Sequence, residues 1–174
     1  MGLTSQNLHR NNPQRKDLKI IEMEEEDIDD VLSIENLCFT SPWTRHSFNQ
    51  ELSLEYSKIL IAKKFTRDHE RIVGHISFWF IADEVHILNL ATHPDFHRQG
   101  IATNLVNSCL ESAILTGAKA VTLEVRKSNR PAITLYEKFA FEAKGIRQRY
   151  YSDNSEDAVI MWLKLGNKKD RLYL

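Results

Sequence analysis

The sequence lacks several features that would place it in a specialised class. No apolar run approaches the roughly 20 residues of a membrane-spanning helix. The formal net charge of −1 gives no basic surplus for general nucleic-acid binding. There are only two cysteines, Cys38 and Cys109, which is too few for a disulfide framework. We therefore expect two small buried thiols in a reducing compartment, and neither a nucleic acid nor a membrane as a partner.

The first 17 residues, MGLTSQNLHRNNPQRKD, lack the apolar stretch of a signal peptide. They also lack a myristoylation signal, because Gln6 stands where Ser or Thr is needed. We predict that residues 1–17 form a disordered tail, that residues 166–174 form a polar C-terminal tail, and that the protein is cytoplasmic. The remainder, in a chain with 42% hydrophobic and 27% charged residues, is typical of one compact domain.

Between the tails, periodicity predicts alternating strands and helices. Apolar alternation and β-rich runs indicate strands, and apolar residues at helical spacing indicate helices. The run AVTLEVR, residues 120–126, alternates cleanly, with its three apolar residues at 121, 123 and 125 opposite Thr122, Glu124 and Arg126. The segment after Gly100 places Ile101, Leu105, Cys109 and Ala113 on one helical face and ends at Gly117. The expected strands are 18–23, 57–65, 71–80, 84–92, 120–126, 141–150 and 157–165, and the expected helices begin near residues 24, 44, 101 and 130. This order predicts one α/β domain with a mixed sheet over residues 18–165.

The stretch DFHRQGIAT, residues 95–103, joins a strand to a helix through a lone glycine. Such a turn points free backbone N–H groups and the positive end of the helix dipole at one place, which suits a phosphate group. It has neither the Gly-Lys-Ser/Thr ending of an NTPase loop nor the three glycines of a dinucleotide-binding loop. Taken alone, the segment leaves two interpretations open, an anion site and a purely geometric turn.

The loop resembles that of the GCN5-related N-acetyltransferase (GNAT) superfamily. The superfamily pattern Gln/Arg-x-x-Gly-x-Gly/Ala is met from His97 to Ala102, with His97 departing at the first position. The resemblance implies that backbone amides here bind the pyrophosphate of acetyl-CoA, and that the end of the preceding strand pairs with the pantetheine arm. The implied cofactor-binding residues are Arg98, Gln99, Gly100, Ile101, Ala102 and Thr103 in the loop and Leu90, Ala91 and Thr92 in the strand.

Three further motifs resemble the ribosomal-protein-alanine N-acetyltransferase (RimI) branch. They are SPWT at 41–44, LEVRKSNRPAITLYEKFAF at 123–141, and RYYSDNSEDAVIM at 149–161. Ala140 replaces the branch's glycine. The resemblance implies a GNAT fold whose sheet is splayed open between its fourth and fifth strands. It also implies acetyl transfer from acetyl-CoA to the N-terminal alanine of a small-subunit ribosomal protein, whose N-terminal peptide would be the partner.

The same resemblance assigns the site residues. Glu124 matches the general base, Tyr136 the general acid, and Asn129 a cofactor contact. Phe39, Trp43, Tyr150 and Tyr151 match the lip that receives the peptide. From the residues alone, each of these could instead be an ordinary surface charge or packing aromatic.

Other interpretations also remain open. His86 lies on the strand before the loop and is a rival base, although a structural imidazole is the simpler reading. Pro94 separates His93 from His97, so a helical metal-ligand pair is not expected and no metal site is predicted. The same scaffold could acetylate a lysine, a polyamine or another small amine, or could bind coenzyme A without turnover as a regulatory module. The oligomeric state is not predicted.

Overall fold

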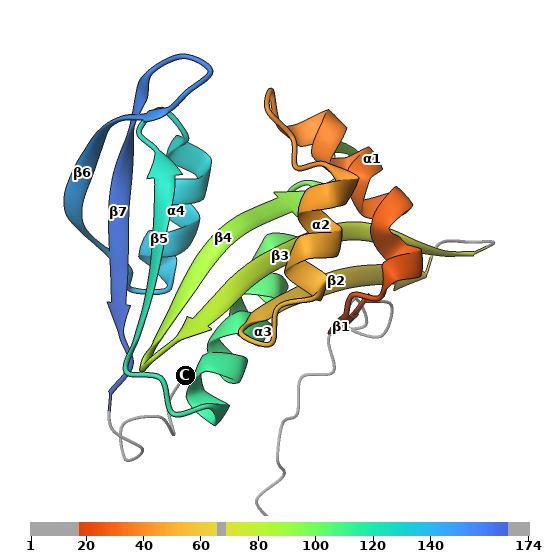
Figure 1. The fold of residues 1–174 in the computed structure, drawn as a ribbon, viewed down its shortest axis with the longest axis horizontal. Helices are drawn as coiled ribbons and strands as arrows, with labels where there is room; N and C mark the ends of the chain where they lie inside the picture. The colour runs from red at the N-terminus through yellow and green to blue at the C-terminus, as the bar shows by residue number, and fades with distance from the viewer. Residues whose placement is uncertain (1–17, 66–68, 167–174) are drawn as a thin grey trace, which may run out of the picture.

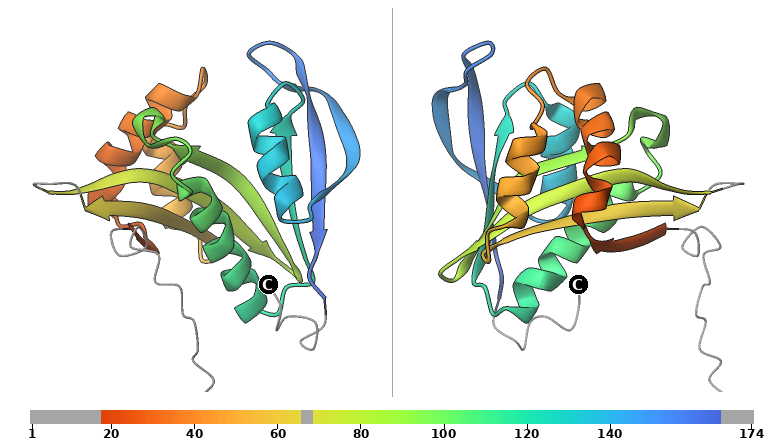
Figure 2. Two further views of the ribbon diagram at one scale, coloured as in Figure 1. Left: turned by 180° about the vertical axis from the view of Figure 1, so that it is seen from behind. Right: turned by 45° about the vertical axis from the view of Figure 1, so that its right-hand side comes forward.

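The computed structural model describes residues 18–65 and 69–166. The predicted tail at 1–17 lies outside the described residues, as do residues 167–174 of the predicted C-terminal tail. Within the described part, the chain forms a mixed α/β domain with helices on both faces of one curved sheet (Figures 1 and 2). The predicted fold class is therefore confirmed.

Seven strands in the described ranges form the sheet, in the order β1-β2-β3-β4-β5-β7-β6. All neighbouring pairs are antiparallel except β4 and β5, which run parallel and are connected through helix α3. Their bounds fall within one or two residues of the predicted ones. The strands are β1 Leu18–Glu22, β2 Ser57–Phe65, β3 Glu70–Ile81, β4 Glu84–Thr92, β5 Ala120–Arg126, β6 Glu142–Tyr151 and β7 Glu156–Lys164.

Helices α1 (Ile28–Cys38) and α2 (Arg45–Leu52) cover one face of the sheet, and α3 (Ile101–Leu115) and α4 (Arg130–Lys138) cover the other (Figure 2). The helix expected from near residue 24 is preceded by a 3₁₀ turn, Glu25–Asp27, before α1 begins at Ile28. Helix α2 begins at a capping box in which Thr44 and Ser47 bond each other's backbone N–H groups. Each face has its own hydrophobic cluster.

The predicted apolar face of α3 is confirmed, because Ile101, Leu105, Cys109 and Ala113 are all buried. The prediction for β5 needs one correction. Its apolar side is buried as expected, but Thr122 on the opposite side is also buried, and its hydroxyl donates to the Met161 carbonyl (3.1 Å). The partner carbonyl lies on the neighbouring strand β7, so alternation within β5 alone does not reveal this bond. Cys38 and Cys109 are both free thiols, the first partly buried and the second fully buried.

The sheet opens between β4 and β5, as predicted for the fourth and fifth strands. The two strands pair only from Glu84 opposite Ala120 to Ile87 opposite Leu123. At that point β4 carries an extra residue, Leu88, between the residues that face Phe78 and Ser77 on β3. A bulge of this kind bends a strand and strengthens its twist. Beyond it β4 stays with β3 while β5 stays with β7, so the two halves of the sheet diverge (Figure 1).

Candidate active site

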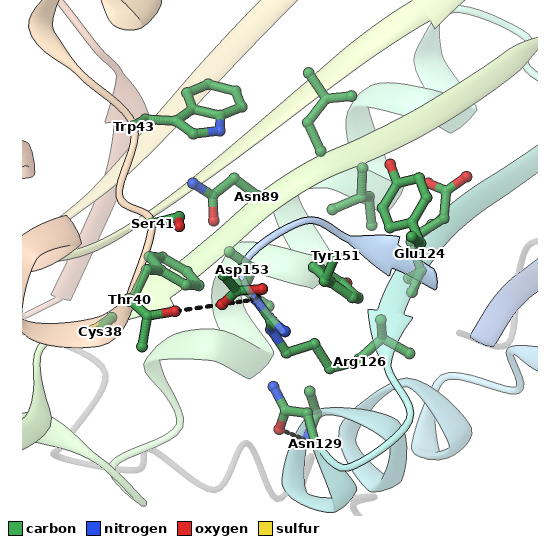
Figure 3. Close-up of a pocket in the computed structure, with 18 of the residues that line it drawn as sticks. Cys38, Thr40, Ser41, Trp43, Asn89, Glu124, Arg126, Asn129, Tyr151 and Asp153 are labelled. Carbon is green, nitrogen blue, oxygen red and sulfur yellow. Dashed lines mark hydrogen bonds and ion pairs between the residues drawn. The ribbon is translucent and has the colours of Figure 1, made fainter. Parts of the chain in front are cut away.

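A cavity of about 580 Å³ occupies the opening between the diverging strands. Its walls come from the end of α1 and the segment before α2, from β4 and β5, from the start of α4, and from the turn between β6 and β7. Figure 3 shows Trp43 and Thr40 on one side of this space and Glu124 on the other. Segments distant in the sequence therefore meet at one place.

Glu124 enters the cavity from β5. Its side chain is a quarter exposed, and its carboxylate forms an ion pair with Arg147 of β6 (Nη2 to Oε1, 3.1 Å). The alternation of β5 explains this position, because Leu123 and Val125 on either side turn into the core. Glu124 is thus a partly solvated carboxylate that a substrate in the cavity can reach.

Tyr136 reaches the same cavity from α4. The residue is only 5% exposed, and its ring packs against Phe141 with centroids 5.6 Å apart. Burial raises the pKa of the Tyr136 phenol above its ordinary value of 10, with smaller contributions from Cys109 and Tyr151. The phenol therefore keeps its proton at neutral pH and remains available as a hydrogen-bond or proton donor.

Helix α4 begins at Asn129, whose side-chain oxygen accepts the Ala132 N–H (3.2 Å). Asn129 is therefore the N-cap of α4. Because that bond uses the oxygen of the amide, the NH₂ group is left for other partners on the cavity wall, where Asn129 also lies. Pro131 follows within the first turn, where its missing N–H costs nothing.

The glycine loop precedes α3 as predicted. Gly100 adopts the left-handed conformation (φ 79°), and Arg98 also has a positive φ of 59°. The first intrahelical bond runs from the Asn104 N–H to the Gly100 carbonyl (3.0 Å), so the amides of the three residues between them have no partner within the helix. The helix N-terminus thus presents free donors at an exposed turn.

Side chains around this loop fix its shape. Gln99 accepts from Lys64 Nζ (2.6 Å) and donates to the Asp95 carbonyl (3.3 Å). The imidazole of His97 lies 2.9 Å from the Thr92 carbonyl. The side chains of Gln99 and His97 therefore brace the turn, which leaves backbone amides and Arg98 for an anion.

The exposed edge of β4 past the bulge carries free backbone groups. The His93 N–H bonds to the Val73 carbonyl of β3. Because successive residues of a strand point their backbone N–H and C=O groups to opposite sides, those of Ala91 face β3 and those of Leu90 and Thr92 face the opening. The Thr92 carbonyl already accepts from Cys38 Sγ (3.4 Å). Of the three strand residues predicted to bind the cofactor, Leu90 therefore has the backbone groups that are most available to a ligand.

Four predicted aromatic residues line the mouth of the cavity: Phe39, Trp43, Tyr150 and Tyr151. Phe39 and Tyr150 are partly exposed, at 37% and 45%. The rings of Tyr150 and Tyr151 meet edge to face with centroids 5.2 Å apart. An apolar rim of this kind suits the entry of a peptide end.

A polar bridge formed by Thr40, Asp153 and Arg126, which the sequence did not predict, crosses the mouth of the cavity. The Thr40 hydroxyl donates to Asp153 (2.7 Å), and Arg126 Nη2 binds both oxygens of the same carboxylate (2.9 and 2.8 Å) (Figure 3). These bonds lower the pKa of Asp153, with the Thr40 bond the largest cause. Arg126 also stacks over the Tyr151 ring at 3.8 Å. The bridge joins the two halves of the domain across the opening.

His86, the alternative candidate for the general base, lies outside the cavity. His86 Nε2 pairs with Glu84 Oε2 at 3.0 Å, and His86 sits opposite Thr122 before the strands diverge. It is not among the residues that line the cavity. In residues 18–65 and 69–166, no cluster of three or more potential metal ligands occurs, and no helix is long and apolar enough to cross a membrane.

Comparison with known proteins decides the family. The sequence model of the acetyltransferase (GNAT) family matches residues 28–141. The chain belongs to the GNAT acetyltransferase family. GNAT acetyltransferases use acetyl-CoA, and the free amides at the start of α3 and the open edge of β4 are the features of this GNAT domain that fit such a ligand.

Individual relatives are also similar over most of the domain. A Bacillus subtilis (strain 168) protein, to which ribosomal protein bS18-alanine N-acetyltransferase activity is ascribed, is 41% identical over 143 residues, covering 81% of this chain and 91% of its own. The Escherichia coli (strain K12) enzyme of that name is 29% identical over 149 residues, covering 84% and 97%. The crystal structure of the Escherichia coli enzyme matches with a TM-score of 0.77 at 28% identity, covering 90% of this chain and 99% of that one.

Proposed function

We propose that this protein transfers the acetyl group of acetyl-CoA to the α-amino group of an N-terminal alanine, and that its natural acceptor is ribosomal protein bS18. The observation that carries the proposal is the meeting of Glu124 and Tyr136 in one cavity, under an aromatic rim, between the diverging strands. The similarity to relatives named for bS18 alanine acetylation supports the choice of acceptor.

The loop before α3 holds the pyrophosphate of acetyl-CoA in this proposal. The amides of Ile101, Ala102 and Thr103 have no partner within the helix, and the helix dipole adds favourable charge for an anion. Gly100 allows the close approach because it has no side chain. The edge of β4 at Leu90 then pairs with the pantetheine arm, which directs the thioester into the opening. Bound there, acetyl-CoA supplies an activated acetyl group.

Glu124 and Tyr136 carry out the proton transfers of the proposed reaction. An α-amino group has a reference pKa of about 7.7–8.0, so most of it is protonated at pH 7 and cannot attack. Glu124 removes that proton, directly or through a water, and the amine nitrogen then bonds to the carbonyl carbon as the carbon–sulfur bond breaks. Tyr136 donates its phenolic proton to the departing sulfur. As the amide forms, the nitrogen loses a second proton, which restores the phenol, and Glu124 releases the first proton to solvent. Alignment of amine and thioester in one cavity supplies much of the rate.

The cavity favours a peptide end over a lysine for two reasons. The aromatic rim and the bridge from Thr40 to Asp153 narrow the entrance above the reacting groups. An α-amine also loses its proton far more readily than a lysine side chain, whose reference pKa is about 10.4. A small first residue, such as alanine after methionine removal, fits this arrangement.

A panel of peptides tests the proposal. Release of free thiol from acetyl-CoA should be fastest with a peptide that begins with Ala, slower with a large first residue, and near background with an N-terminally blocked peptide that contains an internal lysine. Faster turnover of the blocked lysine peptide, or of a polyamine, would overturn the acceptor assignment. No thiol release with any amine would instead indicate a coenzyme-binding module without turnover.

A further inference from the structure

A buried carboxylate forms part of the cavity wall on the acceptor side. Glu35 of α1 is fully buried, and both of its oxygens accept hydrogen bonds. Oε2 accepts the backbone N–H of Trp43 (2.8 Å), and Oε1 accepts Nδ2 of Asn89 (2.9 Å). Burial of a carboxylate is costly unless donors surround it. These two bonds therefore tie the aromatic rim and strand β4 to one fixed point on α1.

A third group approaches the same carboxylate. Nε2 of His75, on β3, lies 2.9 Å from Glu35 Oε1, although the angle is not that of a hydrogen bond. The His75 ring is fully buried and meets Phe48 edge to face. This packing fills the space on the β3 side of Glu35, and the bonds to Trp43 and Asn89 fix the direction of its carboxylate.

Glu35 sets the orientation of the Asn89 amide. A carboxylate oxygen accepts hydrogen bonds and cannot donate them, so Asn89 must present its NH₂ group to Glu35 and its oxygen to the other side. That other side is the cavity, which Asn89 lines between Trp43 and Ser41 (Figure 3). No described residue donates a hydrogen bond to Asn89 Oδ1. The structure therefore holds a free, oriented acceptor in the wall.

We infer that Asn89, oriented by Glu35, positions the acceptor amine by accepting a hydrogen bond from its α-nitrogen, an inference that rests on the proposed function. After Glu124 removes one proton, the amine has two N–H groups and one lone pair. A bond from one N–H to Asn89 Oδ1 leaves the lone pair free to face the thioester.

A neutral amide is better suited to this task than a charged group. Once Glu124 has taken the first proton, a second carboxylate in contact with the amine would favour its return to the ammonium form, which cannot attack. Asn89 and Glu35 both line the cavity, but Glu35 is fully buried and its oxygens accept from Trp43 and Asn89, so the acceptor left free on this wall is the neutral amide. Asn89 is therefore a substrate-contacting residue, and Glu35 is a positioning residue that acts through it.

Asn89→Ala tests the contact. With a synthetic peptide beginning with Ala, the KM for the peptide should rise about tenfold while the KM for acetyl-CoA stays unchanged, since one hydrogen bond to the acceptor is lost. Thr122→Val is the matched control, because it removes a buried hydrogen bond from the neighbouring strand at a position that does not line the cavity. The control should leave the peptide KM unchanged even if both variants lower the melting temperature.

Glu35→Gln tests the positioning. Its new NH₂ group would face Asn89 and favour the flipped amide, which presents a donor to the amine, so the peptide KM should again rise while the acetyl-CoA KM does not. In an Asn89→Ala background, Glu35→Gln should add less than a twofold further change, because residues that act in series are not additive. Multiplicative effects in the double variant would overturn the positioning role.

These experiments distinguish a wrong inference about Asn89 from a wrong proposed function. If the unmodified protein acetylates the Ala peptide and Asn89→Ala keeps its peptide KM, the inference is wrong and the proposed function stands. If the unmodified protein acetylates no peptide terminus, both are wrong.

Discussion

Replacing Gly100 with aspartate places a negative charge at the first turn of α3, where we propose that the pyrophosphate binds. A Cβ at Gly100 would meet only Asn104 Nδ2, at 3.7 Å, so a side chain fits without a clash. By Coulomb's law, a unit charge about 6 Å from two phosphate charges costs about 1.4 kcal/mol in a medium as polar as water. Acetyl-CoA binding should therefore weaken by about tenfold or more.

Two controls separate charge from strain. Gly100→Asn has the same size as the aspartate and also tolerates the positive φ of 79°, but it carries no charge. Gly117→Asp repeats the aspartate at the same φ at the other end of α3, where nothing lies within 4 Å of the new Cβ. Both controls should bind acetyl-CoA within about threefold of the unmodified protein.

Isothermal titration calorimetry with acetyl-CoA measures these affinities, and circular dichroism checks that each variant is folded. The gap between Gly100→Asp and Gly100→Asn should narrow as salt is raised, because salt screens exposed charges. If folded Gly100→Asp binds as tightly as Gly100→Asn at low salt, the pyrophosphate does not lie at this turn.

The remaining predictions concern catalysis and packing. Tyr136→Phe should lower kcat by roughly 10²–10⁴-fold with little change in substrate binding; full turnover would reduce the tyrosine to a packing role. Because burial raises the Tyr136 pKa above its ordinary value, the phenol stays protonated, and the pH–rate profile of the unmodified protein should show no alkaline fall below about pH 10. Glu124→Gln should be slow at neutral pH and recover as pH rises, since solvent then deprotonates the amine; retained activity together with a dead His86→Ala would make the histidine the base. Gly74→Ala should cost about 1–3 kcal/mol in urea denaturation, since its Cβ would lie 2.7 Å from the Ala91 carbonyl oxygen; unchanged stability would show that this contact relaxes freely.

The local patterns of the sequence were enough to predict the strands, the helices and the fold class. The apolar spacing of α3 and the alternation of β5 identify which faces enter the core, because each pattern follows from the period of one element. The loop around Gly100 was equally accessible, since a glycine between strand and helix signals a special backbone turn. The opening of the sheet, by contrast, was implied only by resemblance. The opening coincides with the extra residue Leu88 in β4, and no local pattern marks that bulge.

The site was less predictable because much of it is made by residues far apart in the chain. Asn89 contacts Glu35 across 54 positions, and Thr40 contacts Asp153 across 113. Within the motif at 149–161, nothing around Asp153 indicates this contact, because its acidic and polar residues are ordinary turn formers. The alternation of β5 likewise did not reveal that Thr122 is buried, since the carbonyl that its hydroxyl bonds to lies on β7.

The most direct test of the central claim is to locate the acetyl group itself. The purified protein is incubated with acetyl-CoA and a peptide that begins with Ala and carries one internal lysine, and tandem mass spectrometry assigns the modified nitrogen. The account predicts one acetyl group on the α-nitrogen of Ala, with the lysine unmodified, and loss of that product in Tyr136→Phe. Acetylation of the lysine while the N-terminus stays free would contradict it.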